Sequence, residues 1–333
     1  MRAFLAGPPA SGEARSPEAE EEGEKPLTDP LRSLKSLAAR ASAQAAVLLG
    51  YPDQFPFLAE KEGTIPTFLW AQFSSPPRPE SLGRALPVPL TPKSRAFLEQ
   101  AGVPGIGPII PHGVDGAVFR PAEGRQRLEL KRAWGLEGGF VIGTVAANSP
   151  RKRLDKVIES FASFSLEREG LLLIKTDRTV SAAGLDLERL AERCGVGAKV
   201  RIMTGELGEG EMSRLYAAMD LYLTLSEWEG FGIPVIEAMA CGLPVARLPV
   251  QGPGELVPYG ELLIPGSRIH REGRALLLEA DPRQAAATLL AASANRARLE
   301  ELGRIGRRHV LERCEIRLVA QRWEELIAGT PAR

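Results

Sequence analysis

The sequence predicts an α/β protein with parallel, Rossmann-like sheets, and two observations support this class. From about residue 140 onward, short apolar runs alternate with segments whose apolar residues recur at helical spacing, as in the strand–helix units of parallel sheets. Within this region, Phe140–Ala146 is apolar with little polar alternation, which is typical of a strand covered on both faces. The length of 333 residues, at roughly 150 residues per domain, predicts about two domains.

The helices and strands of this region follow from the same patterns. A helix is expected over residues 154–166, because its apolar side chains recur every three or four positions. Asp281-Pro282 is expected to begin another, since Asp caps free amides and Pro loses no hydrogen bond in a first turn. Further strands are expected at Leu171–Thr176, Lys199–Thr204, Leu221–Leu225, Pro244–Arg247, Leu262–Ile264 and Ala275–Leu278. Further helices are expected at Asp186–Cys194, Met212–Met219, Ile233–Cys241 and Cys314–Ile327.

The first 120 residues or so are less regular. The charged run at residues 18–25 is expected to be a solvated segment, and the Pro-rich run at residues 75–80 a surface loop. Arg120–Gly124 resembles a linker, so we predict domains at residues 1–118 and 119–313. Strands are expected at Arg2–Ala6, Ala45–Leu49, Thr64–Trp70, Leu86–Leu90 and Pro108–Ile110.

Composition excludes several functional classes. The 42 Lys and Arg balance the 42 Asp and Glu, which argues against binding of nucleic acid or an anionic membrane. No apolar run approaches the roughly 18 residues of a membrane span, and the apolar start ends at Pro8-Pro9, too early for a signal peptide. Three cysteines without a C-x-x-C pair, and three histidines, predict neither a disulfide framework nor a zinc site. We therefore expect a reduced, cytoplasmic protein.

The most informative segment is the expected strand, glycine turn and helix at residues 221–241. Gly230 and Gly232 allow backbone amides to approach a ligand, and the helix start adds a positive dipole end. Glu229 lies in the turn and Glu237 in the helix, so both carboxylates can accept hydrogen bonds from the hydroxyls of one ligand. The alternative is a glycine turn at the start of any Rossmann helix, with two surface glutamates.

The run from Glu229-Gly230-Phe231-Gly232 through Glu237 to Val245 resembles the E-x7-E motif of family-4 retaining glycosyltransferases. The resemblance implies the GT-B fold, with two Rossmann-like domains facing a cleft. It also implies that Glu229 contacts a donor sugar, that Glu237 contacts the ribose of the nucleotide, and that backbone around Phe231 cradles the sugar diphosphate.

A second element, Ala147–Arg153, follows the strand Phe140–Ala146. Consecutive cations at a helix start form an anion site, because free amides and positive charges act together. In the same family a basic pair here binds the donor diphosphate, and Lys152 matches the family lysine. The family arginine falls at Ala147, so Arg151 or Arg153 is expected to replace it, with Asn148 beside the donor. The alternative is a solvated helix end.

Weaker donor-site candidates complete the resemblance. His112 lies in a segment similar to the interdomain motif, where it either touches the donor or is structural. Lys175 ends a strand at the cleft edge, and Glu255 either closes the nucleotide pocket or caps a helix. Gly12 belongs to a stretch similar to the family's glycine-rich acceptor-side loop. The resemblance also implies that helix 314–329 completes the first domain, with Trp323 as an interdomain packing residue.

The resemblance implies a retaining glycosyltransferase that uses a nucleotide-diphosphate sugar, and the absence of a D-x-D pair agrees with a reaction that needs no metal. The acceptor is left open among glycans, lipid-linked molecules and small molecules, as is the oligomeric state. The N-terminal domain is shorter than in the family. It therefore leaves a second class of function, a sugar-nucleotide-binding protein or a subunit of a glycosyltransferase complex, and a third, a nucleotide-sugar epimerase.

Overall fold

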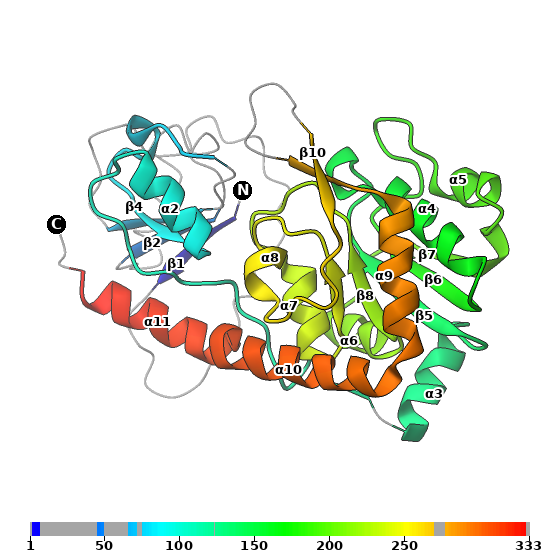
Figure 1. Ribbon diagram of the computed structural model, residues 1–333. Helices are drawn as coiled ribbons and strands as arrows, with labels where there is room; N and C mark the ends of the chain where they lie inside the picture. Colours follow the sequence, from blue (N-terminus) through cyan, green and yellow to red (C-terminus); the bar gives the residue numbers. More distant parts are fainter. Residues whose placement is uncertain are drawn as a thin grey trace. The chain divides into compact units, whose positions relative to one another are not determined.

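The computed structural model describes residues 2–6, 45–49, 66–71, 75–122, 124–269 and 277–330 (Figure 1). Gly12 and the charged run at residues 18–25 lie outside this part of the chain. None of the described helices is long and apolar enough to cross a membrane.

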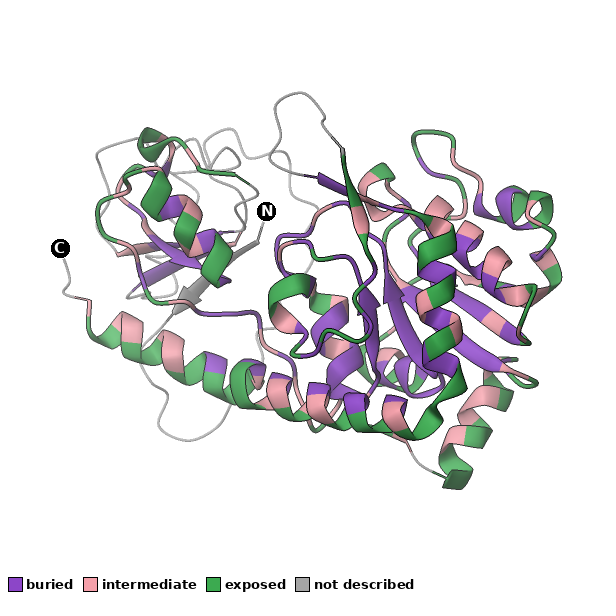
Figure 2. Ribbon diagram, in the orientation of Figure 1, coloured by how far each residue is buried: buried purple, intermediate pink, exposed green. Residues whose placement is uncertain are grey.

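In the described part of the chain, the largest sheet has five parallel strands in the order β7-β6-β5-β8-β9. The middle residues of β5 and β6 are fully buried, and these strands lie at the buried centre of the region in Figure 2. Both faces are therefore covered, which confirms the expected α/β class. The strands are β5 (Phe140–Val145), β6 (Gly170–Lys175), β7 (Val200–Met203), β8 (Leu221–Thr224) and β9 (Val245–Arg247).

Two groups of helices cover this sheet. The strand order reverses between β5 and β8, so right-handed crossovers place the helices after β5 and β6 on one face and those after β7 and β8 on the other. The first group packs together and contains α4 (Leu154–Ser165), α5 (Leu187–Arg193) and α9 (Pro282–Ala294). The second contains α6 (Glu209–Ala217), α7 (Ile233–Ala240) and α10 (Arg296–Cys314), together with α3 (Gly124–Ala133), which packs on α6.

Short elements border the sheet. An antiparallel hairpin joins β10 (Gly266–Ile269) to β11 (Leu277–Ala280). The single-turn elements are η4 (Pro150–Lys152), η5 (Gly197–Lys199) and α8 (Pro253–Leu256).

The N-terminal part contains a smaller sheet of strand order β1-β2-β3-β4 among the described residues. β2, β3 and β4 run parallel, whereas β1 pairs antiparallel with β2. Leu48, Leu69 and Leu98 pack in its core, and Trp323 packs edge-on against Trp70 with ring centroids 5.3 Å apart. Its elements are β1 (Arg2–Ala6), β2 (Ala45–Leu49), β3 (Thr67–Ala71), η3 (Pro79–Leu82), β4 (Leu86–Pro89) and α2 (Pro92–Gln100).

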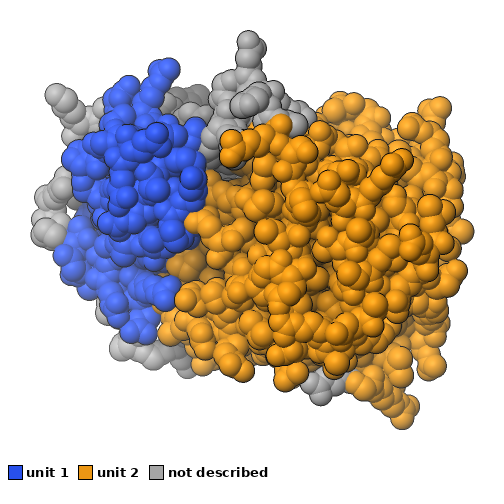
Figure 3. Space-filling view, viewed as in Figure 1, with its two compact units in different colours: residues 1–110, 321–333 blue, residues 111–320 orange. Residues whose placement is uncertain are grey.

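The chain divides into two compact units, coloured separately in Figure 3. Unit 1 contains residues 1–110 and 321–333, and unit 2 contains residues 111–320. The last helix, α11 (Ile316–Ala328), begins in unit 2 and ends in unit 1. The domain boundary expected between residues 118 and 119 stays a prediction.

Three expectations about elements were wrong. Residues 108–110 form no strand; the Ile110 carbonyl instead accepts a 2.7 Å hydrogen bond from the Trp70 indole. Leu262–Ile264 forms only an isolated bridge, between Leu263 and Arg247. The strand expected at Ala275–Leu278 is present as β11 over its described residues, and it pairs with a strand, β10, that the sequence did not indicate. Gly124, expected in a linker, begins α3, whose charged residues are good helix formers but show little apolar periodicity.

Candidate active site

The candidate site lies at the carboxyl edge of the large sheet in unit 2. β5 and β8 are neighbours, and the chain leaves β5 toward β6 but returns from β7 to β8 on the other side. The strand order therefore reverses between them, and ligands of open α/β sheets bind outside the strand ends at such a point. The loops that follow these two strands, residues 146–153 and 225–232, carry the main predicted residues.

Glu229 is the most buried carboxylate of this site that the sequence had singled out, with 8% of its surface exposed. It accepts hydrogen bonds from the Lys152 ammonium, from Arg151 Nη1 at 3.0 Å and from Ser226 Oγ at 2.8 Å. Burial by itself raises the pKa of Glu229, but the two cations outweigh it and hold the pKa below its ordinary value. Glu229 is therefore a fixed carboxylate anion at neutral pH.

The cations come from η4 and are not equivalent. Lys152 is largely buried, and burial, reinforced by repulsion from Arg151, lowers its pKa despite the attraction of Glu229. Arg151 lies over the Trp228 ring, 4.8 Å from its centroid, and donates to the Trp228 carbonyl at 3.3 Å. Arg151 and Lys152 thus face the single carboxylate of Glu229, so this group of three side chains has an excess of positive charge.

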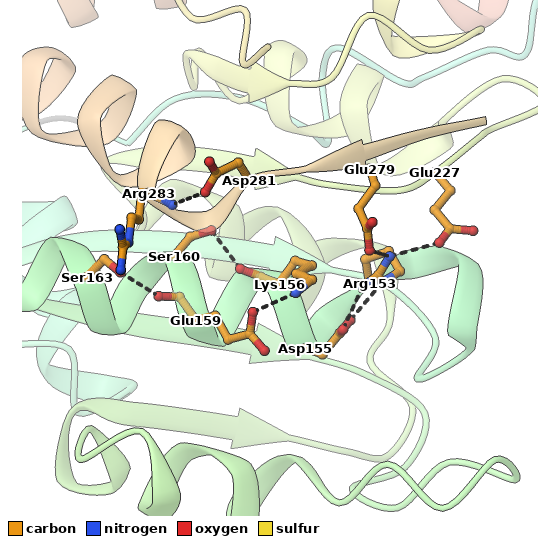
Figure 4. A network of polar contacts seen from close by, with 10 residues as sticks. All are labelled: Arg153, Asp155, Lys156, Glu159, Ser160, Ser163, Glu227, Glu279, Asp281 and Arg283. Atoms are coloured by element: carbon orange, nitrogen blue, oxygen red, sulfur yellow. Dashed lines mark hydrogen bonds and ion pairs between the residues drawn. The ribbon is translucent and has the colours of Figure 1, made fainter. Parts of the chain in front are cut away.

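Arg153 faces different partners. Its backbone is left-handed, with φ 49°, a conformation that costs a side-chain-bearing residue about 1–2 kcal/mol. Its guanidinium forms a two-bond ion pair with Asp155 and further ion pairs with Glu227 and Glu279 (Figure 4). These carboxylate hydrogen bonds outweigh burial and raise the pKa of Arg153. The structure thus brings Arg151 and Lys152 to Glu229 but directs Arg153 to other acids.

The glycine turn is shaped by close packing. Gly232, with φ 100°, immediately precedes α7. Phe231 is buried, and its ring lies edge-on to His112 at 5.0 Å between centroids. Burial lowers the pKa of His112 to about 4, so this ring is neutral at physiological pH. A Cβ on Gly252 would lie 2.1 Å from the Phe231 carbonyl oxygen, so the next loop also requires glycine to pack here.

Glu237 lies in α7, the helix that follows the glycine turn. Its Oε2 accepts a 2.8 Å hydrogen bond from the buried Tyr216 hydroxyl. Burial raises the pKa of Glu237, against the opposing effect of Tyr216. Glu255 accepts a hydrogen bond from Gly252 N–H at 3.2 Å, the contact of a helix cap.

The remaining predicted residues bond to neighbouring loops. Asn148 is buried and donates to the carbonyls of Thr179 and Leu185, at 3.0 and 3.2 Å. Lys175 donates to the Gly205 carbonyl at 2.7 Å. Gly12 lies outside the described residues. In the part of the chain that the structure describes, no three His, Cys, Asp or Glu side chains gather in a metal-ligating arrangement.

Sequence reasoning missed Ser226, Glu227, Glu279 and Tyr216. Ser226 lies three residues before Glu229 in the sequence, and Tyr216 lies in a different helix from its partner Glu237. Neither separation along the chain belongs to a recognised spacing pattern. The pairing of Glu227 and Glu279 with Arg153 joins residues 74 and 126 positions apart. For Glu227 the sequence signal was its charge and its position close to the glycine turn.

Fold and site together define the class of protein. A parallel α/β sheet with a charged cluster at the point where its strand order reverses is an arrangement in which open α/β folds bind ligands. Residues 126–307, more than half of the chain, match the family described as glycosyl transferases group 1. The chain belongs to this family.

Individual relatives agree with this assignment. A D-inositol 3-phosphate glycosyltransferase of Salinispora arenicola is 34% identical over 155 residues, covering 43% of this chain and 34% of the relative. A GDP-mannose-dependent alpha-mannosyltransferase of Mycobacterium tuberculosis is 32% identical over 162 residues, covering 48% and 39%. These matches thus span little more than a third of either relative.

A solved structure shows the similarity of fold over a longer range. The HepE protein of Anabaena, in complex with UDP-glucose, has a TM-score of 0.71 and 18% identity. The similarity covers 91% of this chain and 84% of that protein.

Proposed function

We propose that this protein transfers a sugar from a nucleotide-diphosphate sugar to an acceptor hydroxyl, with retention of configuration and without a metal ion. The observation that carries the proposal is the group of Arg151, Lys152 and Glu229 at the point where strand order reverses. Membership of the glycosyl transferase group 1 family supports it. So do two relatives, one named for GDP-mannose and one solved with UDP-glucose.

The charges suit a diphosphate. The excess positive charge of Arg151 and Lys152 over Glu229 is balanced when a phosphate group binds. A bound phosphate also favours protonated Lys152, whose pKa burial lowers in the free protein. Glu229, held as an anion beside the cations, is then placed to accept hydrogen bonds from sugar hydroxyls. Glu237 would accept from the ribose, in keeping with the E-x7-E motif.

In the proposed reaction the bond between the sugar and the diphosphate breaks, and a bond to the acceptor oxygen forms on the same face of the sugar. The acceptor hydroxyl proton passes to the departing phosphate oxygen. Lys152 and Arg151 stabilise the negative charge that develops on the leaving diphosphate, and fixed charges of this kind supply much of the rate enhancement in group transfer. The cations take the place of a divalent metal.

Release of nucleotide tests the proposal. Purified protein is incubated in EDTA with UDP-glucose or GDP-mannose, with D-inositol 3-phosphate and simple sugars as trial acceptors, and UDP or GDP is measured. We expect turnover of at least one donor, a product of retained anomeric configuration by NMR, and a 100-fold or greater loss in Lys152→Ala and Glu229→Ala, about the effect of losing one transition-state contact.

Full activity of both variants would overturn the assignment of these residues. Tight binding of a nucleotide sugar without turnover on any acceptor would instead favour a sugar-nucleotide-binding protein. Isomerised donor in the absence of acceptor would indicate an epimerase.

A further inference from the structure

We infer that Arg153 is a positioning residue: with Glu227 and Glu279 it forms a clamp that holds the Glu229 turn against η4, and it does not itself bind the donor. The inference rests on the proposed function, because it concerns how the proposed diphosphate site is kept in shape. Arg153, Glu227 and Glu279 are called the Arg153 clamp below.

The charge around Arg153 does not suit a diphosphate. Its guanidinium donates through Nε and Nη2 to Asp155 at 3.0 and 2.9 Å, and through Nη1 to Glu227 at 2.9 Å and to Glu279 (Figure 4). In this group of ion pairs, one cation therefore faces three carboxylates. That group carries excess negative charge and repels a diphosphate, the reverse of the group formed by Arg151 and Lys152.

Glu227 contacts three separate segments of the chain. It is 2% exposed, and its side chain reaches Arg153 at the start of α4. Its backbone N–H donates to the Arg151 carbonyl at 2.9 Å, and its own carbonyl accepts from Leu278 N–H of β11 at 3.3 Å. Glu227 thus connects η4 and the β10–β11 hairpin to the turn that presents Glu229.

The residues of the Arg153 clamp are neighbours of Lys152 and Glu229 in the sequence. Arg153 directly follows Lys152, and Glu227 precedes Glu229 by two residues. The Arg153–Glu227 ion pair therefore runs beside the Lys152–Glu229 ion pair, between the same two loops. Holding the first pair fixes the distance across which the second pair forms, and with it the place where a diphosphate meets Lys152.

The backbone of Arg153 has an unfavourable conformation. In the described residues Arg153 is the one non-glycine residue with a positive φ. Glycine adopts this conformation without the steric cost, so an arginine is retained here at a disadvantage to the backbone. The ion pairs of its side chain are the compensating interaction that the structure shows.

Arg153→Gly is the sharpest variant, because it keeps the left-handed backbone conformation and removes the guanidinium with its ion pairs to Glu227, Glu279 and Asp155. We expect kcat for UDP or GDP release from UDP-glucose or GDP-mannose to fall at least tenfold. The Kd for UDP and GDP, measured by calorimetry, should stay within about twofold of wild type. The acid limb of the kcat profile should move to higher pH, because Glu229 is held less firmly beside its cations.

Two further variants complete the experiment. Glu279→Gln removes one partner whose side chain is 36% exposed, and it should lower kcat by a smaller factor with the same unchanged Kd. It also carries the test if Arg153→Gly does not fold, which thermal unfolding will reveal. Arg298→Ala is the control, since Arg298 pairs with the two acids Glu261 and Glu301 at an exposed position of α10, and its kinetics should match wild type.

Each remaining outcome is decisive. Wild-type kcat in a folded Arg153→Gly or Glu279→Gln variant overturns the clamp. A loss of UDP or GDP affinity in Arg153→Gly as large as that in Lys152→Ala also overturns it, because Arg153 would then contact the nucleotide. A wild-type protein that neither binds nor cleaves either donor overturns the proposed function, and the clamp with it.

Discussion

The two ends of the segment from Ser226 to Ala240 hold glutamates in opposite electrostatic environments. At the turn, Glu229 is surrounded by Lys152, Arg151 and Ser226, and its pKa lies below the ordinary value. In the helix, Glu237 has the Tyr216 hydroxyl as a hydrogen-bond donor, and burial raises its pKa. Glu229 is buried and Glu237 is half-buried, and burial acts to raise the pKa of both, so their partners make the difference.

The difference teaches that partners decide the protonation of a buried acid. Cations repay the lost hydration of the Glu229 carboxylate, whereas one neutral hydroxyl does not repay that of Glu237. In the proposed function the cations beside Glu229 meet the diphosphate, and the Glu229 anion accepts hydrogen bonds from sugar hydroxyls. A carboxyl group near a tyrosine is suited to neutral hydroxyls. The following predictions test this contrast, beginning with the largest effect.

Removing the Lys152 ammonium should strongly destabilise the surroundings of Glu229. In Lys152→Met, Glu229 stays buried with less compensation, and breaking a buried pair in this way should cost about 3 kcal/mol of unfolding free energy. Urea denaturation measures this. The double variant Lys152→Met/Glu229→Gln should lose less than the sum of the single losses, because it leaves no buried carboxylate without its ammonium, and Arg151 is partly exposed to water. Strict additivity would show that the two side chains are not coupled.

Removing the Tyr216 hydroxyl should destabilise the surroundings of Glu237 by a smaller amount. Tyr216→Phe leaves the half-buried Glu237 carboxyl without the hydroxyl that donates to it, which should cost about 1 kcal/mol. The same urea titrations apply, with Tyr222→Phe as a comparison, since the Tyr222 hydroxyl donates to the Val145 carbonyl rather than to an acid. Equal losses in the two variants would mean that the charge of Glu237 plays no part.

The two glutamates should give opposite pH dependence. The folded pKa of Glu229 lies below its unfolded value of 4.5, so its contribution is present above pH 4.5 and disappears as the pH falls through the folded pKa. The folded pKa of Glu237 is raised, so its contribution is present below pH 4.5 and disappears as the pH rises through the folded pKa.

Glu237→Gln should therefore be slightly more stable than wild type at pH 7 and not at pH 4, whereas Glu229→Gln should be less stable at pH 7. Denaturation curves at both pH values measure this. Two glutamine variants that respond alike to pH would contradict the contrast.

The smallest expected effect concerns the Arg151 ring contact. Arg151→Lys keeps the charge near Glu229 but loses the planar stacking on Trp228, worth about 0.5–1 kcal/mol at a partly exposed site. Thermal unfolding at pH 7 measures it, and a second variant, Trp228→Leu, should add little to Arg151→Lys. A full additional loss in the double variant would show that Trp228 acts independently of Arg151.

Much of unit 2 could be predicted because its signals are local. The spacing of Val157 and Phe161 predicted α4, and Asp281 does cap α9 by accepting from Arg283 N–H. Two of the differences from expectation have a clear physical cause. α3 buries no side chain, so its sequence shows little apolar periodicity, and the short polar strand β10 exists only because it pairs with β11.

The candidate site divides in the same way. Glu229 and Glu237 could be singled out from a strand, a glycine turn and a helix that resemble the E-x7-E motif, and Lys152 from adjacent cations at a helix start and its match to the family lysine. Their roles in the proposed reaction remain predictions. Arg153 shows the limit, since three adjacent cations look alike in the sequence and only their partners separate them.

By itself, the sequence determined the α/β class, the main strands and helices of unit 2, and the turn that carries Glu229. Those features depend on residues close together in the chain, whose apolar period and backbone preferences act locally. The tertiary structure alone decided which cation meets which acid and which glutamate is held as an anion. These choices depend on burial and on charges brought together from loops far apart in the chain, and no local pattern records them.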